Sequence, residues 1–210
     1  MREKKYAKTK VSLTKAFIKR VQQKAVADIS IKDVCEEVGV AEKTFYNYFP
    51  HKTDLIEYHL QLEGKRILHQ VDEKAKSGGP VKFIEVLFDL VAEHMENSKF
   101  AHEVMRFILD YKYTKKKIKI SEGEVSYAFS DIKCPNKFLK VTIDEVIEQK
   151  VKEVLKQTKL KNQFLYKELT ITILSILVGT PIIIKKLGLK DIKEKFRNQI
   201  QLCWKGLGIK

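Results

Sequence analysis

Apolar residues recur at helical spacing from the start of the chain. Leu13, Phe17, Val21 and Ala25 follow one another at every fourth position. This spacing places the four side chains on one face of a helix, with charged residues on the other. It predicts a long amphipathic helix over residues 5–27.

Two short helices are predicted next. Ser30 stands where a hydroxyl side chain caps the first of them, which carries two valines on one face. Gly39 ends it, because glycine adopts the left-handed conformation of a helix C-terminus without strain. The second short helix is expected over residues 41–48 and must stop near Pro50.

The rest of the chain is also largely helical in pattern. Further helices are predicted over residues 52–76, after Pro80, from Thr142 with its capping-box partner Glu145, over residues 163–187 and over residues 191–207. The exception is residues 118–138, where Val125, Tyr127 and Phe129 alternate with smaller residues and predict an extended or irregular segment. The fold class is therefore all-α, with eight or nine helices.

Composition narrows the kind of partner and the compartment. Lys and Arg number 41 against 27 Asp and Glu, a net charge of +14, which favours a polyanionic partner, either nucleic acid or an anionic membrane. The three cysteines do not have the number or spacing of a secreted disulfide scaffold. The charged start of the chain does not read as a signal peptide. We expect a cytoplasmic protein.

The most apolar stretch, residues 169–184, bears on the membrane alternative. It contains Thr170, Thr172, Ser175, Thr180 and Pro181. It is also shorter than the roughly 20 apolar residues that span a bilayer. A buried helix is the preferred interpretation.

Residues 30–55 carry the functional signal. Two short helices joined at Gly39 form a helix-turn-helix, in which the second helix enters the DNA major groove. In that helix Phe45 and Phe49 are expected to face the core, which leaves tyrosines and polar residues pointing outward. Exposed tyrosines on so short a helix favour a surface that a partner covers.

These residues resemble the TetR family of bacterial transcriptional regulators. The resemblance is carried by the run Ser30-Ile31-x-x-Val34-Cys35-x-x-Val38-Gly39-Val40-Ala41-x-x-Thr44-Phe45-Tyr46-Asn47-Tyr48-Phe49-x-x-Lys52-x-x-Leu55, which follows one long amphipathic helix. The chain departs from the family at three positions, where it has Ala25 for a glycine, Cys35 for an alanine, and His51 for a Ser or Asn that caps the fourth helix. The resemblance implies a helix-turn-helix DNA-binding domain over residues 1–52 and a helical ligand-binding and dimerisation domain over residues 53–210.

The resemblance also implies roles for individual residues in phosphate contact. The hydroxyls of Thr44 and Tyr48 are expected to donate to phosphates, and Tyr46 to approach the backbone and a base edge. Lys52 is expected to share a phosphate with the free amides at the start of the fourth helix. Lys32 is a further phosphate candidate.

Asn47 and Lys43 are the candidate base readers, since an asparagine can pair bidentately with adenine. The basic arm before the first helix is expected to reach the DNA backbone through Arg2, Lys4, Lys5, Lys8 and Lys10. Net charge does not mark this end of the chain, because residues 28–60 hold three basic and seven acidic side chains. The position of the charges is therefore more informative than their sum.

For the C-terminal part, the resemblance implies a dimer and an effector pocket. The last two predicted helices are expected to form a four-helix bundle with a second copy, with an intrachain core helix as the alternative; the contact residues would be Ile171, Leu174, Leu177, Val178 and Ile182. The effector pocket is unassigned. Its candidates, for which plain core packing is the alternative, are Phe100, Met105, Phe107, Ile108, Tyr111, Tyr127, Phe129 and Phe138.

Other functions find less support in the sequence. There is no catalytic motif or phosphate loop, and His94 and His102 alone do not complete a metal site, so we expect no enzyme, cofactor or metal. The alternative is a basic membrane-surface or interaction protein, for which the basic stretch over residues 112–119 would meet anionic lipid. The sequence favours a homodimeric, ligand-responsive transcriptional repressor acting on a pseudo-palindromic operator.

Overall fold

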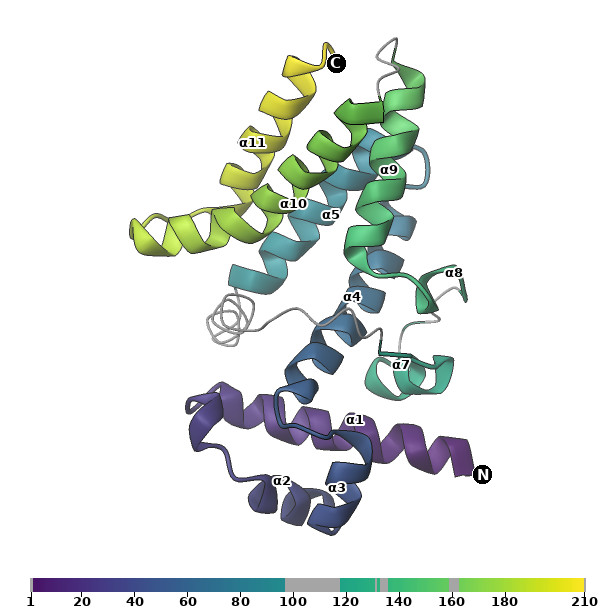
Figure 1. The fold of residues 1–210 in the computed structure, drawn as a ribbon, viewed down its shortest axis with the longest axis vertical. Helices are drawn as coiled ribbons and strands as arrows, with labels where there is room; N and C mark the ends of the chain where they lie inside the picture. Colours follow the sequence, from purple (N-terminus) through teal and green to yellow (C-terminus); the bar gives the residue numbers. More distant parts are fainter. Residues whose placement is uncertain (1, 97–117, 131, 133–135, 159–162, 210) are drawn as a thin grey trace. The chain divides into compact units, whose positions relative to one another are not determined.

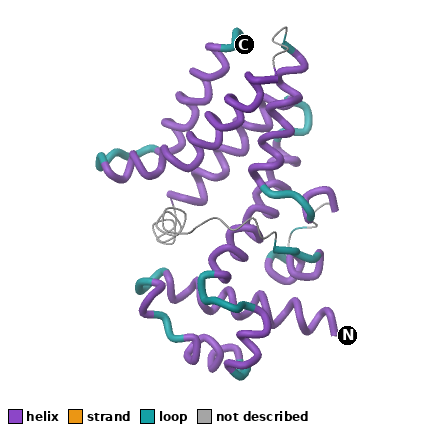
Figure 2. The backbone as a smooth tube through the Cα atoms, viewed as in Figure 1, coloured by secondary structure: helices purple, strands orange, loops and turns teal. Residues whose placement is uncertain are grey.

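The computed structural model describes residues 2–96, 118–130, 132, 136–158 and 163–209. Regular structure in these residues is helical throughout, without strands, which confirms the all-α prediction (Figures 1 and 2). The elements are α1 (Arg2–Val21), the short 3-10 turn η1 (Val26–Asp28), α2 (Ile31–Val38), α3 (Glu42–Tyr48), α4 (Asp54–Lys74), α5 (Gly79–Glu96), α7 (Glu122–Ala128), α8 (Asn136–Leu139), α9 (Ile143–Gln157), α10 (Gln163–Lys186) and α11 (Ile192–Gly206).

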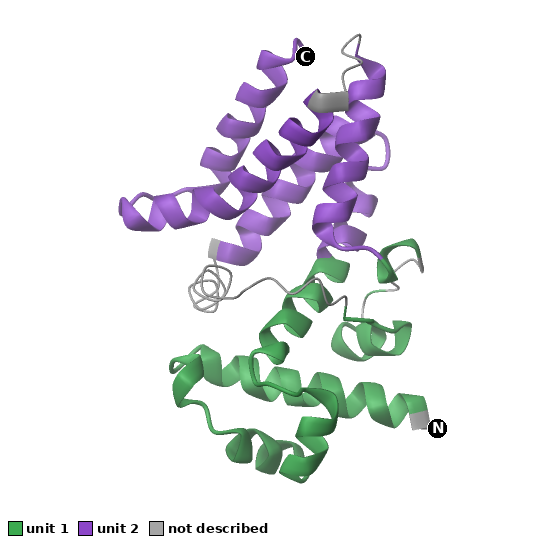
Figure 3. Ribbon diagram, viewed as in Figure 1, with its two compact units in different colours: residues 1–66, 98–140 green, residues 67–97, 141–210 purple. Residues whose placement is uncertain are grey.

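The chain divides into two compact units, coloured separately in Figure 3. The first comprises residues 1–66 and 98–140 and contains α1, α2, α3, α7 and α8. The second comprises residues 67–97 and 141–210 and contains α5, α9, α10 and α11. Helix α4 contributes residues to both. The functional boundary expected after residue 52 stays a prediction.

Helix α1 contributes apolar residues to the core of the first unit but ends earlier than predicted. Leu13, Phe17 and Val21 are buried, as their spacing predicted. The helix stops at Val21, and Ala25 adopts an extended backbone conformation instead of continuing it. The chain then turns so that Ile29 enters the core beside the start of α2.

The prediction of an extended or irregular segment over residues 118–138 is wrong where α7 and α8 lie, whereas the described residues before α7 and just after it are non-helical. A capping box starts α7: the Ser121 hydroxyl accepts from the Glu124 N–H at 3.3 Å, and the Glu124 carboxylate accepts from the Ser121 N–H at 2.7 Å. Val125 is buried and Tyr127 exposed. Two residues two positions apart lie on opposite sides of a helix, so the same alternation fits a helix that is buried on one side.

The second unit packs α5, α9, α10 and α11 around an apolar core. Phe88 and Phe196 meet edge to face with ring centroids 5.0 Å apart. Arg197 forks onto Asp89 through two bonds of 2.8 and 2.7 Å, which join α11 to α5 on the surface. The predicted start of α9 is confirmed, since the Glu145 carboxylate accepts from the Thr142 N–H at 3.1 Å.

Helix α10 is apolar but incompletely buried. Its segment Leu165–Lys186 is long and apolar enough to cross a membrane, with mean hydropathy 1.7, and only 22% of that apolar window is buried. The prediction of a buried helix therefore holds for part of its surface only. Ile171 and Val178, which lie seven residues apart and so on the same side of the helix, are exposed.

Candidate nucleic-acid interface

The turn between α2 and α3 has the geometry that its sequence predicts. The Ser30 hydroxyl accepts from the Asp33 N–H at 3.3 Å and caps α2. Gly39 ends α2 with φ at +72°, in the left-handed region where a side chain would be strained. Both residues thus act where the sequence placed them.

An apolar core between α2 and α3 and an ion pair to α1 hold the two helices in place. Val34 of α2 and Phe45 of α3 are fully buried. The Arg20 guanidinium of α1 pairs with the Glu37 carboxylate and donates to the Asp33 carbonyl at 3.0 Å. Arg20, largely buried itself, therefore ties α1 to α2.

Helix α3 separates its buried residues from the polar residues predicted to contact DNA. Phe45 and Phe49 are buried, as expected. Lys43, Tyr46 and Asn47 are exposed on the open side, and Thr44 and Tyr48, which lie nearer the buried side, are half-buried. Five of the seven predicted DNA-contacting residues thus share this short helix.

Lys52 lies in the turn before α4, which begins at Asp54 and not at Lys52. Its ammonium group donates to the Ala27 carbonyl at 2.7 Å and lies 3.5 Å from the Ile29 carbonyl. Lys52 therefore fastens the chain around η1, a structural role that the sequence did not suggest. The Asp54 carboxylate accepts from the His51 N–H at 2.8 Å and satisfies a backbone donor at the helix start.

A shallow hollow of about 440 Å³ lies beside α3 in the first unit. Its lining combines an aromatic ring, a cation and an imidazole with small apolar groups, and consists of Ile29, Ile31, Tyr46, Pro50, His51, Lys52 and Thr53. Tyr46 and Lys52, predicted separately, thus border the same surface depression.

Lys32 and the basic arm are placed differently from the rest of the set. Lys32 is exposed on α2, with its ammonium 3.9 Å from the Glu36 carboxylate. The expected arm is the first part of α1, where Lys4, Lys5 and Lys8 are exposed. The expectation for Lys10 is wrong: it is 6% exposed and turns into the unit, where it pairs with Glu124.

Tyr6 is a candidate that the sequence did not single out. Its ring lies on that of Tyr48, with centroids 4.7 Å apart and planes tilted by 51°. Burial, the Glu124 carboxylate and Tyr48 together raise the pKa of the Tyr6 hydroxyl, so it stays protonated. The signal was an aromatic ring flanked by exposed lysines in a helix that precedes the matched motif.

The candidates for an effector pocket are mostly untested. Phe100, Met105, Phe107, Ile108 and Tyr111 lie outside the described residues, as do His102 and Cys134 and all but the last two residues of the basic stretch 112–119. Phe138 is buried, and Phe129 packs under the Arg66 guanidinium, 4.9 Å from its ring centroid. A hollow of about 410 Å³ in the second unit is lined instead by Val81, Val154, Gln157, Thr158, Leu207, Gly208 and Ile209.

The two described cysteines are packing residues. Cys35 is buried in α2 and Cys203 is partly buried in α11. Burial raises the pKa of both thiols, and the Glu42 carboxylate adds to the effect at Cys35. A raised pKa lowers the thiolate fraction and so the reactivity of both groups.

A capped helix-turn-helix with polar and aromatic residues on its open side defines a DNA-binding protein of the helix-turn-helix class. Residues 18–58 match the model of the bacterial regulatory proteins of the tetR family. This match over the N-terminal segment supports membership of that family and a role as a DNA-binding transcriptional regulator. A search of curated proteins finds no match.

Proposed function

We propose that the protein is a cytoplasmic, ligand-responsive repressor that binds a pseudo-palindromic operator as a homodimer. The observation that carries the proposal is the single open side of α3, where Lys43, Tyr46 and Asn47 are exposed above a buried Phe45. A helix of this kind presents its polar side to base edges in the major groove.

The seven candidate residues divide into two kinds of contact. Asn47 and Lys43 read bases, because amide and ammonium groups at the exposed side of α3 reach the groove floor. The remaining five contact the phosphate backbone: Lys32, Thr44, Tyr46, Tyr48 and Lys52, with Tyr46 also approaching a base edge. Lys52 keeps one donor hydrogen beyond its bonds to the Ala27 and Ile29 carbonyls, so its structural role leaves capacity for a phosphate.

The dimer is proposed to form through α10 and α11. Ile171 is 57% and Val178 is 38% exposed, and Leu202 of α11 is 68% exposed. Leu174, Leu177 and Ile182 of α10 are half-buried within the chain. Apolar side chains exposed at this spacing are typical of an interface, and a two-fold dimer matches the symmetry of a pseudo-palindrome.

Control by a ligand requires that residues 1–52 bind DNA and that residues 53–210 bind the ligand and form the dimer. A ligand that binds the C-terminal part more tightly in one arrangement of the dimer shifts the population toward it. If that arrangement holds the two DNA-binding domains of the dimer at a separation that does not match the operator, operator affinity falls. The factor by which it falls equals the factor by which operator DNA weakens binding of the ligand. The ligand is an apolar or amphipathic molecule, or an anion that the excess lysines attract.

Fluorescence anisotropy tests the proposal. The protein is titrated against the duplex upstream of its own coding sequence and against a scrambled duplex at about 150 mM salt, where non-specific binding is weak. Binding to the native duplex at least ~1000-fold tighter than to the scramble supports specific readout. No binding to either duplex at any salt contradicts it.

The exposed apolar surface of α10 favours one alternative function, that of a basic membrane-surface protein. The segment Leu165–Lys186 has the length and hydropathy for contact with lipid. Flotation with vesicles containing about 30% anionic lipid distinguishes the two functions. Vesicle binding without DNA binding supports the alternative, whereas a protein that stays in the aqueous fraction and binds DNA supports the regulator.

A further inference from the structure

We infer that the DNA-reading surface includes Tyr6 of α1, which positions Tyr48, and that a buried network anchored on α7 holds Tyr6 in place. Tyr6, Lys10 and Glu124 all lie outside the family match at residues 18–58. The inference rests on the proposed contact of Tyr48 with DNA. It adds an aromatic residue of α1 and a buried support from α7 to a site so far built on α2, α3, the turn before α4 and the lysines at the start of α1.

The first step is the contact between the two tyrosines. Tyr48, at the end of α3, is half-buried, and its ring lies on the ring of Tyr6. Tyr6 is itself 48% exposed, so the pair stands at the surface. A ring packed on one face restricts the rotation of Tyr48 and fixes the direction of its hydroxyl.

The second step is the anchor behind Tyr6. The Lys10 ammonium lies 5.9 Å from the centroid of the Tyr6 ring and 4.2 Å from that of Tyr58. It pairs with the Glu124 carboxylate at 2.8 Å, one turn of α1 beyond Tyr6. Lys10 therefore lies within cation–π range of both aromatic rings, close to Tyr58 and at the limit of that range from Tyr6.

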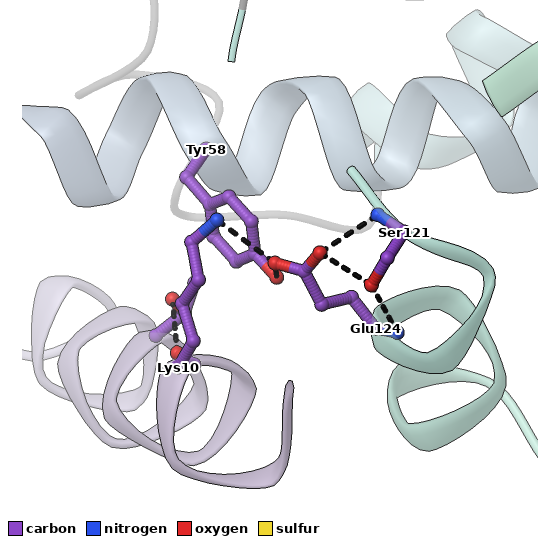
Figure 4. A network of polar contacts seen from close by, with 5 residues as sticks. Lys10, Tyr58, Ser121 and Glu124 are labelled. Atoms are coloured by element: carbon purple, nitrogen blue, oxygen red, sulfur yellow. Dashed lines mark hydrogen bonds and ion pairs between the residues drawn. The ribbon is translucent and has the colours of Figure 1, made fainter. Parts of the chain in front are cut away.

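The third step is the rigidity of that anchor, drawn in Figure 4. One oxygen of Glu124 accepts from Lys10 and from the Tyr58 hydroxyl, the latter at 2.9 Å. The other accepts from the N–H and the hydroxyl of Ser121, both at 2.7 Å. Every oxygen of the buried carboxylate is thus satisfied, as a buried charge requires.

The C-terminal end of α3 reaches this network by two routes. Tyr48 reaches it through Tyr6. Phe49 reaches it through Tyr58, with ring centroids 5.6 Å apart. The end of the recognition helix consequently packs on two rings, those of Tyr6 and Tyr58, that lie beside the Lys10–Glu124 pair. A further hydrogen bond joins α1 to α7, from the Lys15 ammonium to the Ala128 carbonyl at 2.9 Å.

The experiment measures operator affinity for single and double variants by anisotropy, at a temperature where circular dichroism shows each variant folded. Tyr6→Ala is expected to weaken binding about threefold for each DNA-binding domain, because the loss of one aromatic pair corresponds to a change of about that size. The dimer has two such domains, so its affinity is expected to fall about tenfold. Tyr6→Phe keeps the ring and is expected to bind within about twofold of wild type. Tyr127→Ala removes another exposed tyrosine of the same unit and serves as the control.

Double variants separate positioning from simple loss of stability. If Tyr6 acts through Tyr48, Tyr6→Ala weakens wild type but has no further effect in a Tyr48→Ala background. Likewise Glu124→Gln weakens binding more when Tyr6 is present than when Tyr6 is already alanine, where only the route through Tyr58 remains. Equal effects in both backgrounds, or a Tyr6→Ala variant with wild-type affinity, overturn the inference.

The outcomes also distinguish this inference from the proposed function. Tyr48→Ala that weakens binding while Tyr6→Ala does not would leave the DNA-binding site intact and overturn only the role of Tyr6. Tyr48→Ala without effect would remove Tyr48 from the proposed site and the inference with it. Loss of binding in Tyr6→Phe would show that the hydroxyl, and not the ring, is what matters, and would overturn positioning.

Discussion

Lys10 and Glu124 form a buried ion pair that joins α1 to α7 at 2.8 Å, with side chains only 8% and 4% exposed. Two charges this deep are stable only when each is paired and bonded. Burial on its own would raise the pKa of Glu124, but the bonds from Lys10 and Ser121 outweigh it and lower that pKa. Glu124 is therefore charged at neutral pH and keeps Lys10 inside.

Removing one partner of this pair is expected to destabilise the protein strongly. Glu124→Leu leaves the Lys10 charge buried without its carboxylate, at a cost of about 3–5 kcal/mol in the free energy of unfolding. The double variant Lys10→Met/Glu124→Leu is expected to recover much of that loss. Urea denaturation measures all three proteins, and a double variant less stable than Glu124→Leu would contradict the account.

Stability is expected to fall as pH is lowered from 7 toward 5 because of His59. Burial, with the Arg66 guanidinium nearby, lowers the pKa of His59 from 6.5 to about 4. Below pH 6.5 the unfolded chain takes up a proton that the folded protein does not, so unfolding is favoured as pH falls. His59→Gln is expected to flatten the pH dependence of the urea midpoint between pH 7 and 5, and an unchanged slope would contradict it.

The sequence predicts the helix-turn-helix well because the residues that define it act locally. Ser30 and Gly39 fix the ends of α2 through their own chemistry, and the spacing of Phe45 and Phe49 decides which side of α3 is buried. Contacts between distant segments left no such signal. The pairing of Lys10 with Glu124 depends on where α7 packs, which periodicity does not report.

Two predictions fail for different reasons, one tertiary and one local. Lys10 was expected to reach DNA because a lysine in a basic run is normally exposed, yet tertiary contact with Glu124 buries it. The segment containing α7 was read as extended from its alternation, although Ser121 and Glu124 have the capping-box spacing that marks a helix start. Weighing that cap above a three-residue alternation would have predicted the helix.

Lys52→Met is expected to have two separable effects. Loss of its bonds to the Ala27 and Ile29 carbonyls lowers the free energy of unfolding by about 1–2 kcal/mol. Loss of a phosphate contact lowers the slope of log affinity against log salt by about 0.9 for each DNA-binding domain. Lys140→Met, at an exposed lysine of the same unit, is the control. A lower stability with an unchanged salt slope would assign Lys52 a structural role alone.

Asn47→Ala is expected to relax sequence preference. A bidentate contact to adenine contributes about 1–3 kcal/mol of discrimination, so operator affinity falls while affinity for a scrambled duplex is unchanged.

Tyr48→Phe removes a phosphate donor and is expected to weaken binding to both duplexes alike. Anisotropy on the two duplexes measures both ratios, and an unaltered ratio for Asn47→Ala would exclude it as a base reader.

Val178→Glu is expected to convert the dimer to monomer. Val178 lies on the exposed side of α10, where a buried carboxylate facing its symmetry copy would cost several kcal/mol. Gln157→Glu places the same group on the exposed side of α9 and is expected to leave the dimer intact. Sedimentation velocity measures the mass of each variant. A dimeric Val178→Glu protein would place the interface elsewhere.

Hydroxyl-radical footprinting on the duplex upstream of the coding sequence tests the central claim most directly. A homodimer that reads DNA through two copies of α3 predicts two protected patches related by a dyad, with centres about 34–36 Å apart or a multiple of that distance. Both patches are expected to fade together in Val178→Glu. A single asymmetric patch, or protection that spreads evenly along the duplex, would contradict the account.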